Sequence, residues 1–246
     1  MNCVRLAAVG DVHVGLDSGA VLNSELLVET ADVLLVAGDL TRHGTPAEAE
    51  MFAAEVATVP VPVVVVLGNH DFESEAAEEV RTIMESAGAI VLDGGSVDVE
   101  LDGVRVGIAG TPGFGGGFRG ASCSEFGEPL MKAFVRHSRA MADALCDSLK
   151  RLDTDLRIAL THYSPIEATL DGERREIYPF LGSYLLAEAI DAGGAHLAIH
   201  GHAHRGSRAG TTPCGVPVRN VARPVIGRPF TVLRLDPDGL AEDPDA

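Results

Sequence analysis

Polar side chains able to bind metal follow five short apolar runs of this 246-residue sequence. The runs are rich in Val, Ile and Leu and are too short for helices, so each is predicted to be a buried strand. The residues after them are Asp11 and His13, then Asp39, then Asn69 with His70 and Asp71, then His162, then His202 with His204. Because ligands of α/β sheets bind at the carboxyl ends of the strands, we expect these side chains to meet at one edge.

The donor atoms of this set indicate metal chemistry. Imidazole nitrogens and carboxylate oxygens without any thiolate suit ions of intermediate hardness, such as Mn, Fe or Zn. One carboxylate can bridge two ions, which then lie roughly 3.5–4 Å apart. The sequence therefore predicts a site for two divalent metal ions.

The motifs resemble a known signature. The blocks Asp11-Val-His13, Gly38-Asp39, Gly68-Asn69-His70-Asp71, His162 and Gly201-His202-Ala-His204 are similar to the motifs of the calcineurin-like metallophosphoesterase superfamily. All five occur in order, each after a predicted strand, and they extend from near the N-terminus to residue 204. One such block alone would be weak evidence, but five in register are specific.

This resemblance implies a fold and a role for each residue. The fold would be a four-layer αββα sandwich, an α/β architecture with two mixed sheets face to face and helices outside. His70 would be catalytic and would lie beside the substrate. The metal ligands would be Asp11, His13 and His204 for one ion, Asn69, His162 and His202 for the other, and Asp39 bridging both.

Two positions separate this chain from better-known branches of the superfamily. Purple acid phosphatases have a metal-binding Tyr three residues after the Gly-Asp aspartate, where this chain has Arg42. Protein Ser/Thr phosphatases continue Gly-Asp with Val-Asp-Arg-Gly, and the Asp that orients their catalytic His is missing here. The chain therefore resembles the small bacterial-type and phosphodiesterase-like branches, and the group that orients His70 is left open.

The elements that must position these motifs alternate along the chain. Thr45-Pro-Ala-Glu48 is typical of a helix start with a capping box, a second helix is expected over about 73–87, and an apolar stripe predicts a third from about Leu130 to Leu152. One domain is expected over 1–235, followed by a loose acidic tail over 236–246. Strands are expected at 4–10, 33–38, 61–68, 104–110, 156–161, 196–200, 216–221 and 229–235.

The composition limits the classes of partner that we expect for this protein. The formal net charge of −17 repels polyanions, which argues against a nucleic-acid groove and leaves a small phosphate ester as the expected substrate. No signal peptide or membrane-spanning run is predicted, and the four scattered cysteines are typical of a reduced, cytoplasmic protein. The oligomeric state is not predicted.

Several residues near the motifs have two interpretations. Asp71 either orients His70 or caps the following helix. Arg42, His43 and Arg119 are candidate substrate-binding residues, with a solvated loop as the alternative for the first two. The Gly-rich segment 111–120 is interpreted as a mobile lid rather than a plain flexible loop, and it does not fit a P-loop because no helix starts after it. His200 is a candidate for supporting the metal ligands.

The predicted reaction is in-line hydrolysis of a small phosphomonoester or phosphodiester. Two metals would activate a bridging hydroxide for attack on phosphorus, and His70 would protonate the leaving group. Two alternatives remain. One is a non-catalytic metal-binding scaffold on the same fold, and the other is a nuclease of the superfamily, against which the acidic composition argues.

Overall fold

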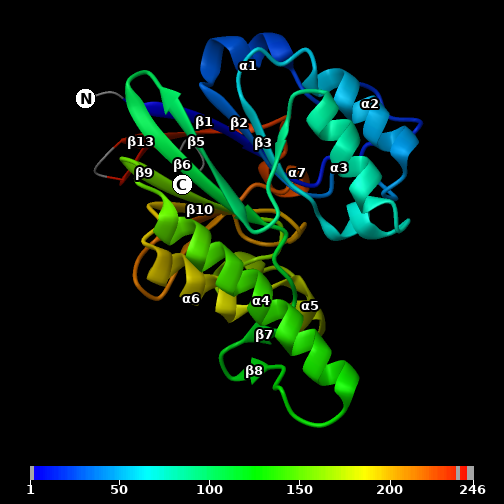
Figure 1. Cartoon of the computed structure of the whole chain (residues 1–246), viewed down its shortest axis with the longest axis vertical. Helices are drawn as coiled ribbons and strands as arrows, with labels where there is room; N and C mark the ends of the chain where they lie inside the picture. The colour runs from blue at the N-terminus through cyan, green and yellow to red at the C-terminus, as the bar shows by residue number, and fades with distance from the viewer. Residues whose placement is uncertain (1–2, 237–238, 243–246) are drawn as a thin grey trace.

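The computed structural model describes residues 3–236 and 239–242. Two β-sheets pack face to face between two sets of helices (Figure 1). Helices α1, α2 and α3 cover the outer face of one sheet, and α4 and α6 cover the outer face of the other. This is the four-layer αββα sandwich that the motifs imply.

The first sheet has a parallel centre and an antiparallel edge. Its strand order is β14-β13-β1-β2-β3-β4, in which β1 to β4 run parallel and β13 pairs antiparallel with both β1 and β14. The strands are β1 (Val4–Val9), β2 (Val33–Ala37), β3 (Val63–Val66), β4 (Ile90–Val91), β13 (Thr231–Asp236) and β14 (Gly239–Glu242).

The second sheet also has a parallel centre, but an antiparallel strand lies at each of its edges. Its order is β11-β12-β10-β9-β6-β5, with β6, β9, β10 and β12 parallel and the two outer strands antiparallel to their neighbours. The strands are β5 (Gly95–Leu101), β6 (Val104–Thr111), β9 (Leu156–Thr161), β10 (Leu197–His200), β11 (Ala209–Thr211) and β12 (Pro217–Asn220). A separate small ribbon joins β7 (Gly117–Phe118) to β8 (Ala121–Ser122).

The helices lie between these strands in the chain. The α-helices are α1 (Ser24–Thr30), α2 (Pro46–Val56), α3 (Ala77–Ser86), α4 (Pro129–Arg151), α5 (Tyr178–Leu181), α6 (Tyr184–Gly193) and α7 (Arg223–Ile226). Three short 3₁₀ helices are η1 (Asn69–Phe72), η2 (Glu167–Leu170) and η3 (Arg175–Ile177). No helix among the described residues is long and apolar enough to span a bilayer.

Alternation along the strands builds three hydrophobic layers. In β1, Leu6 and Ala8 face the second sheet, whereas Ala7 and Val9 face the helices, because successive strand residues point to opposite faces. Both faces of the central strands are therefore buried, which explains why they read as continuous apolar runs. On the far side, Leu145 of α4 packs in the layer that covers the second sheet.

The strands predicted from the apolar runs are confirmed, with ends that shift by one or two residues. The capping box of α2 is present: Glu48 N donates to Thr45 Oγ1 at 3.4 Å, and Thr45 N donates to Glu48 Oε2 at 3.3 Å. The second predicted helix starts later than expected, at Ala77, because Glu75 has a φ of 58° and interrupts the helical backbone between η1 and α3.

The sequence interpretation missed several elements. Helix α1, capped by Asn23, was not predicted, nor were the edge strand β5 and helix α6. The predicted loose tail over 236–246 is also wrong in part, because Asp236 ends β13 and Gly239–Glu242 forms β14 beside it. Residues 237–238 and 243–246 of that predicted tail lie outside the described residues.

Candidate metal centre

The loops after β1 and β2 are joined by backbone hydrogen bonds. Asp11 N donates to Gly38 O at 3.0 Å and His13 N donates to Asp39 O at 3.0 Å. A third bond, from Val14 N to Leu40 O at 2.9 Å, extends the pairing past the strand ends. These bonds hold the first two polar motifs at a fixed separation.

The second sheet meets the first at the same edge. Gly10 N donates to Val221 O at 2.9 Å, so the end of β1 contacts the segment that follows β12. The backbone N–H of His202 donates to the Asp11 carboxylate at 2.9 and 3.1 Å. The carboxyl ends of strands from both sheets therefore converge on one place, as predicted.

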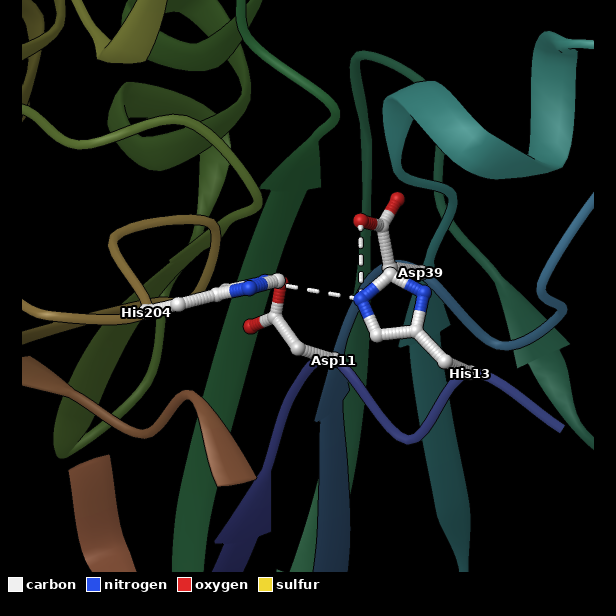
Figure 2. A group of neighbouring side chains, drawn as sticks. All are labelled: Asp11, His13, Asp39 and His204. Carbon is white, nitrogen blue, oxygen red and sulfur yellow. Dashed lines mark hydrogen bonds and ion pairs between the residues drawn. The ribbon is translucent and has the colours of Figure 1, made fainter. Parts of the chain in front are cut away.

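Seven side chains meet there, and we call them the donor cluster: Asp11, His13, Asp39, Asn69, His162, His202 and His204. One ligand atom from each of Asp11, His13, Asp39 and His204 lies within 4.8 Å of the others, and the same holds for Asp39, His162 and His202. Figure 2 shows the first group, with dashed lines joining His13 to Asp39 and to His204. Asp39 belongs to both groups.

The backbone of the donor cluster is unusual. Of the described non-glycine residues, six have a positive φ, and four of these are Asp11 (58°), His13 (47°), Asp39 (53°) and His202 (68°). L-residues rarely adopt this left-handed conformation because Cβ then crowds the backbone. Strained residues of this kind gather where the surrounding structure fixes them for a function.

Glycines in the motifs allow the side chains to approach closely. A Cβ on Gly68 would lie 2.2 Å from Asp39 Oδ1, and a Cβ on Gly201 would lie 2.4 Å from Asp11 Oδ2. Neither contact is possible for real atoms, so these positions require glycine. This explains physically why Gly precedes Asn69 and His202 in the sequence.

The arrangement of His162 fits a cation. Its Nδ1 donates to the Ala37 carbonyl oxygen at 2.8 Å, so Nε2 of the neutral ring carries a lone pair. That nitrogen lies 3.0 Å from Asn69 Oδ1 and 3.4 Å from Asp39 Oδ1. Electron-rich atoms at these distances repel one another unless a positive charge lies among them, so the donor set suits a metal ion.

Burial and hydrogen bonding shift the pKa values of residues in the donor cluster. Burial lowers the pKa of His13 to about 4 and that of His202 to about 3, despite the nearby Asp11 carboxylate. Burial also opposes ionisation of Asp11, but the hydrogen bond from His204 and the neighbouring histidines lower its pKa to about 2. Near neutral pH, His13 and His202 can therefore bind a metal without first losing a proton.

The pKa values of two groups in the donor cluster are raised instead. The hydrogen bond to Asp11, 2.9 Å from His204 Nε2 to Asp11 Oδ1, raises the pKa of His204. Burial raises the pKa of Asp39, partly offset by His162. A cation between these groups would replace the proton and favour the ionised form of Asp39.

His70 is oriented by a backbone group. Its Nδ1 donates to the Arg42 carbonyl oxygen at 2.7 Å, and its backbone N–H donates to Asp39 Oδ1 at 2.9 Å. The ring lies edge-on to His13, with 4.6 Å between centroids. The carbonyl of Arg42 thus takes the place of the orienting carboxylate that the sequence lacks at this position, with the Glu73 carboxylate 3.7 Å from the same nitrogen, and no hydrogen bond of the His70 Nε2 is found among the described residues.

Asp71 has neither of the two roles predicted for it. Its carboxylate is fully buried and accepts hydrogen bonds from Gly68 N (2.8 Å), Thr41 N (2.9 Å), Thr41 Oγ1 (2.7 Å) and Leu40 N (3.2 Å). Burial and Asp39 raise the pKa of Asp71, and the bonds from Gly68 and Thr41 oppose that shift. Asp71 therefore ties the loop that carries Asp39 to the loop that carries Asn69.

The three candidate substrate-binding residues make their contacts outside the donor cluster. Arg42 Nη1 pairs with Asp17 at 2.8 Å, and His43, 59% exposed at its side chain, lies 3.4 Å from Glu73. Arg119 pairs with Glu188 of α6 and lies over the Tyr184 ring. A substrate contact by these side chains remains a prediction, and Arg119 would have to leave Glu188 to make one.

The Gly-rich segment 111–120 is held by backbone contacts, which differs from the predicted mobile lid. Gly116 N donates to Pro179 O at 2.7 Å, and Gly117 N donates to Gly182 O at 2.9 Å. A Cβ on Gly115 would lie 2.5 Å from Pro179 O. These glycines let the segment pack directly against α5, so their main role is close packing rather than mobility.

One buried residue, His200, and one half-buried residue, Tyr163, lie next to the donor cluster. His200 is fully buried, with Nδ1 2.7 Å from Gly201 O and Nε2 2.8 Å from Thr169 Oγ1. Sequence reasoning did not single out Tyr163, whose ring lies 4.5 Å from that of His202. Its position directly after His162 was the available signal.

Comparison with known proteins gives the family. A family model described as calcineurin-like phosphoesterase matches residues 4–206, and the chain belongs to that family. The match includes the whole donor cluster. Together, the family and the clustered His and Asp side chains support a metal-dependent phosphoester hydrolase. Curated protein sequences offer no significant match.

Solved structures share the fold at low sequence identity. Phosphopantetheinyl hydrolase from Mycobacterium tuberculosis has a TM-score of 0.66 at 16% identity, over 89% of this chain and 88% of that one. The protein TT1561 of Thermus thermophilus has a TM-score of 0.57 at 15% identity, over 96% of each chain. A candidate 5′-nucleotidase from Staphylococcus aureus has a TM-score of 0.60 at 16% identity over 97% of this chain, which spans 52% of that protein.

Proposed function

We propose that the protein is a dinuclear metal-dependent phosphoesterase that hydrolyses a small phosphomonoester or phosphodiester. The observation that carries the proposal is the sharing of Asp39 between two groups of convergent ligand atoms. An isolated structural cluster would not need a carboxylate common to two sets. The free Nε2 of His70, beside His13, supplies a group suited to proton transfer.

Each residue has a defined part in this proposal. Asp11, His13 and His204 would hold one ion, Asn69, His162 and His202 the other, and Asp39 both. When bound, two such ions activate a water molecule, hold phosphoryl oxygens and neutralise charge that develops on them. The carbonyls of Ala37 and Arg42 fix the tautomers of His162 and His70, so that Nε2 is the working atom of each ring.

His70 would act on the leaving group. With Nδ1 donating to Arg42 O, a protonated ring can give the Nε2 proton to the departing alkoxide and take it back from water in the next cycle. Its backbone bond to Asp39 links the position of this acid to the residue that would bridge the metals. The net charge of −17 favours a small ester over a nucleic acid as substrate.

Asp39→Asn tests the proposal directly. We expect wild-type protein loaded with Mn²⁺ to hold close to two ions per chain by elemental analysis and to hydrolyse p-nitrophenyl phosphate or its bis ester. Asp39→Asn should lower occupancy of both sites and activity by on the order of 10²–10³-fold. Asp98→Asn, on the exposed side of β5, is the matched control and should behave as wild type. Two tightly held ions in Asp39→Asn would contradict the shared role.

A further inference from the structure

A cavity of about 400 Å³ adjoins the donor cluster. It shares Asn69 with the cluster, and its walls include Phe72, Phe114, His137, Met141 and Tyr163. We call it the aromatic pocket. Its volume is within the range of small-molecule sites, which are mostly apolar with a few polar groups. None of these wall residues belongs to the metal motifs.

A chain of ring contacts connects the pocket to the donor cluster. The Tyr163 ring lies 4.5 Å from His202 and 5.7 Å from Phe114, and Phe114 lies 4.7 Å from His137. Figure 1 shows that the elements involved, the end of β6 and the side of α4, lie beside each other next to the strand ends. A group attached to a phosphate held at the cluster would therefore enter the pocket directly.

Packing contacts within the protein fix the walls of the pocket. Phe114 packs against Phe134 at 5.0 Å, and Thr111 Oγ1 donates to Met141 Sδ at 3.4 Å. Gly113 has a φ of +75°, and a Cβ there would lie 2.9 Å from Leu186, so the turn that presents Phe114 is tightly constrained. Rigid rings around a cavity favour a flat ligand that can stack, because aromatic pairs gain from defined geometry.

The charged residues at the pocket further restrict which ligand groups can bind there. Asp93 is its charged lining residue, held by Arg81 Nη2 at 2.9 Å, and no Lys or Arg lines the pocket among the described residues. A second phosphate or a carboxylate on the ligand would therefore find no Lys or Arg side chain to pair with among these lining residues. A neutral heteroaromatic ring with N–H groups could instead donate to Asp93.

We propose, building on the proposed function, that the aromatic pocket binds a planar, uncharged aromatic group of the substrate, and that the preferred substrates are phosphate esters of the nucleoside type. Phe114, Phe72 and Tyr163 would stack on the ring, and Asp93 would accept from its N–H groups. Sugar phosphates that lack a base would use the donor cluster alone.

The test compares two ligands with the same phosphoryl end. The probes are the non-hydrolysable phosphonate analogues of adenosine 5′-monophosphate and of ribose 5-phosphate, in which a CH₂ group replaces the ester oxygen. Calorimetry on wild-type protein loaded with Mn²⁺ should show the adenosine analogue binding roughly 10- to 100-fold more tightly. Inorganic phosphate is titrated in parallel. If phosphate itself does not bind, the proposed function fails, whereas equal affinities for the two analogues overturn the pocket proposal alone.

Three variants test which residues cause the preference for the adenosine analogue. Phe114→Ala should bring the two affinities to within a few-fold of each other, with phosphate and ribose-analogue binding unchanged. Phe72→Ala, whose side chain is exposed in part on η1, tests the opposite wall without loss of core packing. Phe126→Ala, 83% exposed and outside the pocket, is the matched control and should keep the preference. A preference that survives both pocket variants would overturn the assignment.

Discussion

The donor cluster and the aromatic pocket adjoin at Asn69 and Tyr163, yet they are held together differently. The cluster is held by hydrogen bonds that involve backbone groups: the Ala37 carbonyl orients the His162 ring, and backbone N–H groups of Gly68, Thr41 and Leu40 donate to the Asp71 carboxylate, which ties two loops. The pocket is fixed by side chains packed on side chains, as in the contact of Phe114 with Phe134. A change in the cluster should therefore affect every substrate, whereas a change in the pocket should affect selection among substrates.

The largest expected effect is that of His70→Ala. Loss of general acid catalysis should reduce turnover ~10²–10⁴-fold for an ester with a poor leaving group. Nitrophenolate departs without a proton, so p-nitrophenyl phosphate should lose far less. Both metals should remain by elemental analysis, because His70 Nδ1 is occupied by Arg42 O and the ring is not among the proposed ligands. Stripped metal, or an equal loss on both esters, would contradict the role of acid.

The second effect is on stability of the metal-free protein. Burial lowers the pKa of His200 from 6.5 to about 4, so between these values the unfolded chain binds a proton that the folded protein does not. Stability is therefore present above pH 6.5 and is lost as pH falls towards 4, by ~3 kcal/mol for this group. Urea unfolding in the presence of chelator should show a flatter pH dependence in His200→Gln. Identical slopes would contradict the assignment.

Asp71→Asn should give a smaller effect on the cluster. The amide offers one acceptor oxygen in place of the carboxylate that accepts from Gly68, Thr41 and Leu40. Loss of such supporting contacts typically lowers metal affinity by about 10–100-fold. Competition with a fluorescent chelator measures this affinity, and Asp98→Asn serves again as the control. Loss of activity with unchanged metal affinity would mean that Asp71 acts in another way.

The smallest effect should come from the pocket. Met141→Ala removes a thioether from the ring-lined wall, and such contacts contribute ~0.3–1.5 kcal/mol. The adenosine phosphonate should bind about 2- to 10-fold more weakly, while inorganic phosphate binding and metal content stay the same. Calorimetry measures both ligands on one sample. An equal loss for phosphate would show that pocket and cluster are not separable.

The difference between the donor cluster and the aromatic pocket also explains which features could be predicted from the sequence. The donor cluster was predictable because each ligand follows an apolar strand, and parallel strand ends must meet at one edge. Two short-range signals, the capping box at Thr45 and the glycine after α3, were also predictable. The pocket was not, because Phe72, Phe114 and Met141 come from three separate segments, η1, the loop after β6 and α4, whose side-chain directions depend on tertiary packing.

Other supporting groups leave no sequence signal. The bond from His70 to Arg42 O involves a backbone carbonyl, which every residue has, so residue type does not mark it. The role of Asp71 could not be assigned because its four hydrogen-bond donors lie on two loops. These loops come together only in the folded protein. Helix α1 is short and has one fully buried side chain, Leu27, so its periodicity is weak.

The left-handed backbone of His13 bears on the residue type at that position. An L-residue in this conformation costs roughly 1–2 kcal/mol relative to an ordinary one, and glycine removes most of that cost. The His13 side chain lies 3.4 Å from His204 and 3.6 Å from Asp39, so His13→Gly would relieve the backbone strain and remove a proposed metal ligand. Replacement by glycine would relax the backbone and remove a proposed metal ligand in a single step, so the strain at His13 is best accounted for by the proposed metal site.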